Sequence, residues 1–176
     1  MTAPVPEFSR RLTVAEVPGR GCEIDLVAGP GECAALAARF AIPEIRALTA
    51  RVRLRRLAGG LVRVAGSLAA EVVQSCVVTL CPVVSSVADR FDITFGAAPE
   101  GDEDELDLSF DSADPPEPIV DGTIDVGEVV AEHLALALDP FPRSADAVFT
   151  PPEAAAPAEE SASPFAILSR LRKNEG

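Results

Sequence analysis

The sequence predicts an α+β fold: an antiparallel β-sheet, open or curled towards a barrel, covered by a C-terminal helix, with a short helix after the second strand. Residues 51–95 alternate apolar and polar side chains over three successive runs, which is typical of half-buried antiparallel strands. Residues 126–138 instead carry apolar side chains at helical spacing, over the most apolar helical stretch of the chain. A sheet with one apolar face needs a cover, and this helix can supply it.

The composition is that of one globular domain with a tail. Of the 176 residues, 48% are hydrophobic, and because Trp and Tyr are absent, the core must consist mainly of Val, Leu, Ile and Ala. Residues 1–11 lack an apolar run behind a basic region, and no stretch of about 20 apolar residues follows, so neither a signal peptide nor a membrane span is predicted. The four cysteines then indicate reduced thiols, and we expect a cytoplasmic protein.

The elements before residue 50 are predicted as scaffold. Residues 6–17 form a first strand with loose alternation, and residues 21–27 form a second strand with Cys22, Ile24 and Leu26 on one face. A break at Gly29-Pro30-Gly31 leads to an Ala-rich helix over 32–40, which ends at Ile42-Pro43. Residues 44–50 lead into the sheet.

Three strands, over residues 51–57, 61–78 and 87–95, form the predicted meander. In the first strand, Arg51, Arg53 and Arg55 share the polar face, and the turn at 58–60 contains paired glycines suited to a hairpin. In the second strand, Arg63 lies on the polar face opposite Val62 and Val64. The third strand places Arg90, Asp92 and Thr94 opposite Phe91, Ile93 and Phe95.

Charge divides the chain sharply. The formal charge is −13, yet no Lys or Arg occurs between Arg90 and Arg143, a span that holds 15 Asp and Glu residues. Residues 96–118 form a long acidic connection, functional or disordered, in which 106–110 could add an edge strand. Two interpretations stay open: a solvated acidic loop, or an acidic surface for a basic protein.

The C-terminal third holds the covering helix and a tail. Asp125 is the predicted N-cap of helix 126–138, with Glu128 completing a capping box, and Asp139-Pro140 ends the helix. The Pro, Ala, Glu and Ser composition of 151–163 indicates a linker, and 164–173 is predicted as a short amphipathic helix that either folds back or docks on a partner. We therefore expect one domain over 1–150, followed by linker and helix.

No catalytic constellation is predicted. The only histidine, His133, has no local nucleophile to activate, and the spacing of Cys22, Cys33, Cys76 and Cys81 contains no C-x-x-C hook for zinc. The sequence has no phosphate-binding glycine loop and no EF-hand register. We thus expect no enzyme activity, no metal, no cofactor and no small-molecule substrate. A metal-dependent nuclease that uses Asp121 is the third-ranked alternative.

Several stretches resemble the YceD family of large ribosomal RNA subunit accumulation proteins. These are VQSCVVTL at 73–80, EPIVDGTIDVGE at 117–128, AEHLALALDPFPR at 131–143 and SPFAIL at 163–168. The resemblance implies a bacterial protein, with plastid relatives in plants, that supports the synthesis, processing or accumulation of large-subunit ribosomal RNA. Many members carry C-x-R-C where this chain has Cys76-Val77-Val78-Thr79, so no role of that cysteine pair is carried over.

The resemblance and the charge division together predict a binding protein. We expect the strip of Arg51, Arg53, Arg55 and Arg63 to contact phosphates of ribosomal RNA or of a large-subunit assembly intermediate. A partner, which could be a basic ribosomal protein, is expected at Asp121, Glu128, Glu132, Phe141 and Arg143. The competing hypothesis is a protein-only adaptor or chaperone that binds a basic ribosomal protein through the acidic segment, in which the arginines merely solvate the sheet.

Overall fold

The computed structural model describes residues 6–97 and 115–149. The chain divides into two compact units, Met1–Ala145 and Asp146–Gly176, and the fold below is that of the first. The strand expected at 106–110, the linker at 151–163 and the helix at 164–173 lie outside the described residues. The single domain expected over 1–150 stays a prediction.

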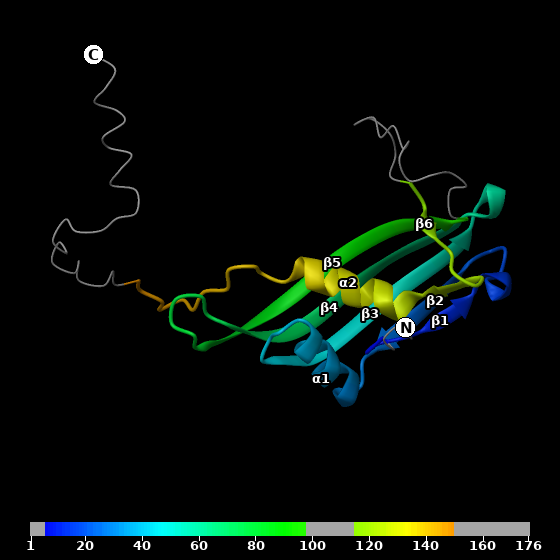
Figure 1. Cartoon of the computed structure of the whole chain (residues 1–176). Coiled ribbons are helices and arrows are strands. Elements are labelled where there is room, and N and C mark those ends of the chain that lie inside the picture. Colours follow the sequence, from blue (N-terminus) through cyan, green and yellow to red (C-terminus); the bar gives the residue numbers. More distant parts are fainter. Residues whose placement is uncertain (1–5, 98–114, 150–176) are drawn as a thin grey trace, which may run out of the picture. The chain divides into compact units, whose positions relative to one another are not determined.

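An antiparallel sheet with helices on one side confirms the predicted fold class (Figure 1). The strands β2 (Cys22–Val27), β3 (Glu44–Arg56), β4 (Val62–Ser75), β5 (Pro82–Gly96) and β6 (Glu117–Pro118) lie in that order, and only the β5–β6 pair is parallel. The sheet is open, with β2 and β6 at its edges, and is not a closed barrel. The helices are α1 (Pro30–Arg39) and α2 (Val126–Ala137).

The first predicted strand was too long. Only Arg11–Thr13 forms a strand, β1, and it pairs with β7 (Thr123–Asp125) in a separate two-stranded ribbon. The loose alternation over 6–17 has a physical reason, because a short 3-10 turn over Val14–Glu16 follows β1 directly. The ribbon places the N-terminal segment against the start of α2, since the Val126 amide donates to the Arg10 carbonyl at 3.1 Å.

The meander strands begin and end differently from the prediction. The lead-in over 44–50 is the first half of β3, where a bulge between Ile45 and Ala47 shifts the alternation by one residue. At the other end, β4 stops at Ser75, because residues 76–81 form the hairpin turn, and β5 begins at Pro82. Helix α1 starts earlier than predicted, since Pro30 occupies its first turn.

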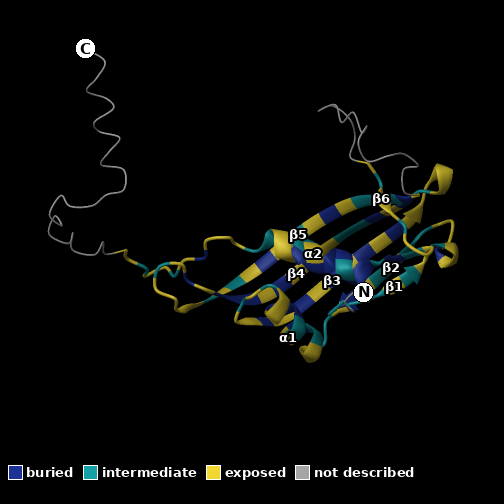
Figure 2. Ribbon diagram, viewed as in Figure 1, coloured by how far each residue is buried: buried dark blue, intermediate teal, exposed yellow. Residues whose placement is uncertain are grey.

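Burial alternates along β3, β4 and β5, as Figure 2 shows. The apolar face packs under α2, whose Val130 and Leu134 are fully buried. Gly66 of β4 leaves room on this inner face, because a Cβ there would lie 2.5 Å from Cζ of Phe91. The Phe91 ring in turn stacks on His133 of α2, with the ring centroids 4.8 Å apart. The helix thus covers the sheet as predicted, and the opposite face of the meander is left to solvent.

Asp125 is the N-cap of α2, as the sequence predicts. Its Oδ1 accepts from the amides of Gly127 at 3.1 Å, Glu128 at 3.3 Å and Arg10 at 2.7 Å, and its Oδ2 accepts from the Ser9 hydroxyl at 2.5 Å. The Glu128 carboxylate, predicted to complete a capping box, instead accepts from the Arg39 guanidinium at 2.6 and 3.0 Å. It therefore joins α2 to the end of α1.

Candidate nucleic-acid interface

The solvent face of β3 and β4 carries all four arginines predicted to contact RNA. Arg51, Arg53 and Arg55 alternate along β3 and are exposed, while Val52 and Leu54 between them are buried. Arg63 of β4 lies directly opposite Arg55 in the strand register. The period of two therefore brings the guanidinium stems together on one face, as expected. Their role in binding RNA stays a prediction.

Three of these arginines form ion pairs with carboxylates on neighbouring strands. The Arg51 Nε donates to Asp25 Oδ1 at 2.7 Å, and the Arg53 Nε donates to Glu23. Both carboxylates belong to the edge strand β2 and lie opposite these arginines in the register. Arg63 donates two parallel hydrogen bonds to Asp92 of β5, one of them 2.7 Å long. The strip is thus already partly neutralised within the sheet.

The effect on the carboxyl groups is electrostatic. The hydrogen bond from Arg51 lowers the pKa of Asp25, and that from Arg63 lowers the pKa of Asp92. All of these side chains are largely exposed, from 41% for Glu23 to 72% for Arg53. Exposed ion pairs of this kind add little to stability, because water screens them. The arginines are therefore held loosely and can exchange partners.

A fifth arginine, Arg90 of β5, belongs to the same face, although it was not among the residues predicted to contact RNA. The register places Ser67 between Arg51 and Arg90 across the sheet. Arg90 and Arg55 take part in no ion pair with the residues that the structure describes. The sequence signal was present, since alternation put Arg90 on the polar face of β5, but only the strand register brings it to the others. We call Arg51, Arg53, Arg55, Arg63 and Arg90 the arginine face.

The residues predicted to bind a partner do not form a single cluster. Glu128 and Glu132 of α2, together with Glu117, line a hollow of about 400 Å³ beside β6. Asp121, Phe141 and Arg143 are not among the residues that line it. Phe141 is 70% exposed beyond the end of α2, and Asp121 lies in the turn before β7 with a φ of 52°. Their role in binding a partner stays a prediction.

The hollow is lined by more carboxylates than cations, since Arg11 is the one basic residue among its lining side chains, and it therefore favours a basic group. Partial burial raises the pKa of Glu132, and the neighbouring carboxylates of Glu128 and Glu117 raise it further. A Lys or Arg side chain placed in the hollow would reverse part of this shift, since it would favour the ionised carboxylate. The negative charge of the Glu128 carboxylate is already partly neutralised, because Glu128 forms an ion pair with Arg39.

His133 has a structural environment. Its Nδ1 lies 3.1 Å from Asp89 Oδ2, and its ring packs on Phe91 beneath α2.

Within residues 6–97 and 115–149, no three His, Cys, Asp or Glu side chains gather in a way that could hold a metal ion. Over the same residues, no helix has the length and apolar character needed to cross a membrane.

The buried thiol of Cys76 accepts hydrogen bonds from two backbone amides. Its Sγ accepts from the amides of Thr79 and Ser144, each at 3.4 Å, at the point where residues 139–144 cross the β4–β5 turn. Two further bonds hold this crossing, from Gln74 Nε2 to the Asp139 carbonyl at 2.8 Å and from the Val77 amide to the Pro142 carbonyl at 2.9 Å. All four cysteines are free thiols, Cys33 and Cys76 buried, Cys22 half-buried and Cys81 exposed.

The hydrogen bonds to Cys76 predict a pH-dependent stability. The Thr79 hydroxyl first, and then the Ser144 and Thr79 amides, lower the pKa of this thiol from 9.0 to about 6. Since the folded state holds the thiolate better than the unfolded state, its contribution is complete above pH 9.0 and is lost as the pH falls towards 6. The native protein should therefore become more stable relative to Cys76→Ser as the pH rises across this range, when the two are compared by their free energies of unfolding. Urea denaturation of both proteins at several pH values measures it, and parallel pH profiles would refute the thiolate.

Comparison with known proteins places the chain among protein families. A protein-family model described as Large ribosomal RNA subunit accumulation protein YceD matches residues 64–172. The matched region includes β4 from Val64 onward, β5, α2 and the crossing at Cys76. It excludes all four arginines predicted to contact RNA, which are Arg51, Arg53 and Arg55 of β3 and Arg63 at the start of β4. No curated protein and no solved structure matches the chain.

Proposed function

The chain belongs to the YceD family of large ribosomal RNA subunit accumulation proteins, and we propose that it serves this accumulation by binding large-subunit RNA, or an assembly intermediate that contains it, through the arginine face. Membership in the family implies a role in the accumulation of large-subunit ribosomal RNA. The step proposed here is the mechanism, which is binding through Arg51, Arg53, Arg55 and Arg63 without catalysis.

One observation carries the proposal: positive charge gathers on one exposed face of a strongly acidic chain. On this face, the strand register aligns the side chains of β2–β5 in three rows that run across the sheet. Together these rows carry the five guanidinium groups of the arginine face and only three carboxylates, those of Glu23, Asp25 and Asp92. The whole chain has a net charge of −13 and should repel RNA elsewhere. Arginine forks match phosphate geometry, so the contact is directed to this face. Because few phosphates are neutralised, binding should be weak and sensitive to salt.

The first test removes three guanidiniums of β3. We expect the triple variant Arg51/Arg53/Arg55→Ala to bind large-subunit RNA about 10- to 100-fold more weakly at low salt. Each charge-assisted hydrogen bond to phosphate that is lost, and that no other group replaces, should weaken the affinity about tenfold. The slope of log affinity against log salt should also fall by about 2, since each phosphate contact on single-stranded RNA contributes about 0.7. Filter-binding titrations at several salt concentrations measure both quantities.

The matched control removes the same charge from other sites. Arg11, Arg20 and Arg46 are exposed and lie away from the three rows. The variant Arg11/Arg20/Arg46→Ala should therefore keep most of the affinity and the salt slope. Equal binding by the native protein and the β3 triple variant would remove the arginine face from the mechanism.

A second function has its own supporting observation. The hollow lined by Glu117, Glu128 and Glu132 could receive a Lys or Arg side chain of a basic ribosomal protein, which would make the chain an adaptor that needs no RNA. This hypothesis predicts that a bound protein persists after ribonuclease treatment and is lost in Glu117/Glu132→Gln. RNA binding through the arginine face predicts that the associated components depend on RNA.

A further inference from the structure

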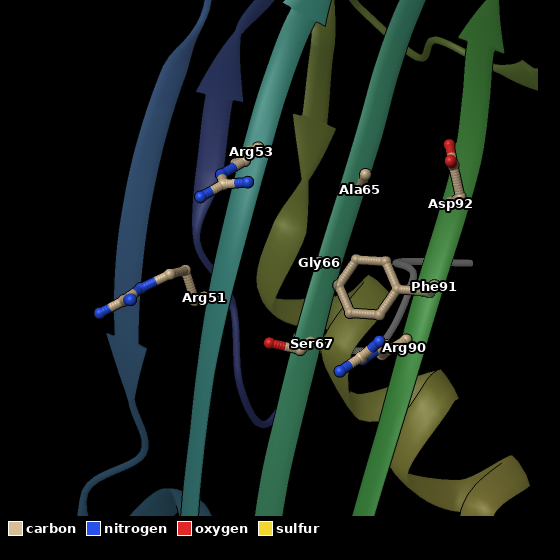
Figure 3. A pocket seen from close by; sticks show the side chains of 8 residues that line it. All are labelled: Arg51, Arg53, Ala65, Gly66, Ser67, Arg90, Phe91 and Asp92. Carbon is tan, nitrogen blue, oxygen red and sulfur yellow. The ribbon is translucent and has the colours of Figure 1, made fainter.

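The arginine face contains a hollow whose floor is β4. It has a volume of about 500 Å³, and its floor is the stretch Ala65-Gly66-Ser67, where the two outward-facing side chains, those of Ala65 and Ser67, are small. Arg51 and Arg53 of β3 form one wall, and Arg90 and Asp92 of β5 form the other (Figure 3). A group lying on the floor would therefore reach the β4 backbone between two rows of charged side chains.

The donors around the hollow suit an anion. Figure 3 shows the guanidinium group of Arg90 directed across the hollow towards Ser67. The register places these two residues directly opposite each other. A guanidinium group carries five N–H donors and no acceptor, and a serine hydroxyl can add one donor. A phosphate oxygen placed between them would have donors from two sides.

The other two arginines are turned away from the hollow. In Figure 3, the guanidinium groups of Arg51 and Arg53 are directed towards β2, where Asp25 and Glu23 accept their hydrogen bonds. These contacts lie in solvent, with Asp25 67% and Arg51 59% exposed, so their net stabilisation is small. A phosphate in the hollow offers the same acceptor chemistry on the opposite side of each arginine.

We propose that this hollow is a subsite for one phosphate group of the RNA backbone, with Arg90 and Ser67 as its resident donors, and that Glu23 and Asp25 compete with the phosphate for Arg51 and Arg53. The proposal rests on the proposed function, because the phosphate is that of bound RNA. It adds Arg90 and Ser67 to the interface and gives the carboxylates of β2 the role of weakening RNA binding. The affinity is then set by an exchange of ion pairs.

The test compares two pairs of carboxylates with equal charge change. The variant Glu23→Gln/Asp25→Asn should bind a single-stranded fragment of large-subunit RNA about tenfold more tightly, because one or two charge-assisted hydrogen bonds become available to phosphate. The control Glu44→Gln/Glu71→Gln releases Arg46, which donates to both residues away from the hollow. That control should change the affinity by less than about twofold, as the long-range charge effect is screened by salt.

A second pair of variants tests the resident donors. Arg90→Gln should weaken binding about tenfold and lower the salt slope by about 0.7, the contribution of one phosphate contact, while Arg46→Gln should leave both nearly unchanged. The gain from Glu23→Gln/Asp25→Asn should also disappear when Arg51, Arg53 and Arg55 are already alanine, since it acts through two of them. All these positions are exposed on the sheet surface, and thermal melts establish that each variant is folded.

The outcomes separate the subsite from the proposed function. If both carboxylate pairs tighten binding equally, or if Arg90→Gln behaves as Arg46→Gln does, the subsite is wrong. The proposed function still stands in that case, provided that the triple variant of β3 has lost affinity. If that triple variant binds RNA as the native protein does, the proposed function fails as well.

Discussion

Replacing Leu134 with Asp is expected to unfold the domain. Leu134 lies in the second half of α2 and is fully buried. The substitution removes about 1.5–3 kcal/mol of apolar burial and places a carboxylate inside the hydrophobic core, so the total cost should exceed about 4 kcal/mol. Such a loss is comparable to the whole stability of a small domain, which is about 5–15 kcal/mol.

A neighbouring residue gives the matched control. Leu136 is on the same helix and is 79% exposed. Leu136→Asp makes the same chemical change at the surface and should shift the free energy of unfolding by less than about 0.5 kcal/mol. Circular dichroism with urea denaturation compares the two. A folded Leu134→Asp with the urea midpoint of Leu136→Asp would contradict the packing of α2 on the sheet.

Replacing Asp125 with Ala should destabilise the domain by about 2–4 kcal/mol. The N-cap bonds to the amides of Gly127 and Glu128 contribute about 0.5–2 kcal/mol. The remainder comes from the N-terminal segment, because the Arg10 amide and the Ser9 hydroxyl lose their acceptor, at about 1–3 kcal/mol for a partly buried group left unpaired.

An isosteric variant distinguishes the effect of losing these hydrogen bonds from the effect of shortening the side chain. Asp125→Asn keeps a carbonyl oxygen at the position of Oδ1, which accepts three of the four hydrogen bonds, and Asn is as good an N-cap as Asp. We expect it to lose less than about 1 kcal/mol. If Asn and Ala cost the same in urea denaturation, the hydrogen bonds do not hold the N-terminal segment to α2.

Helix α2 and the alternation of the meander could be predicted because each depends on a local period. Val130 and Leu134 follow the helical repeat, and Arg51 and Arg53 follow the repeat of two, so the sequence alone assigns each residue to a face. The start of β3 could not be predicted, since the bulge at Arg46 breaks the alternation. The pattern therefore predicts the two halves of β3 as separate segments.

The partners of the arginines were beyond prediction for a different reason. The register between β2 and β3 decides that Asp25 faces Arg51, and the register between β4 and β5 decides that Arg90 joins them. Neither register leaves a local signal in the sequence. The crossing at Cys76 likewise joins residues 68 positions apart, through the Ser144 amide. Long-range contacts of this kind depend on the assembled fold.

RNA is proposed to lie on the arginine face and not on the side of the sheet that α2 covers. Ultraviolet crosslinking in cells, followed by mass spectrometry of the peptides that carry an attached nucleotide, tests it most directly. We expect attached nucleotides on peptides of β3, β4 and β5, at outward-facing residues such as Ser67 and Arg90. Attachment confined to α2 and the residues around Glu117, with none on these strands, would contradict it.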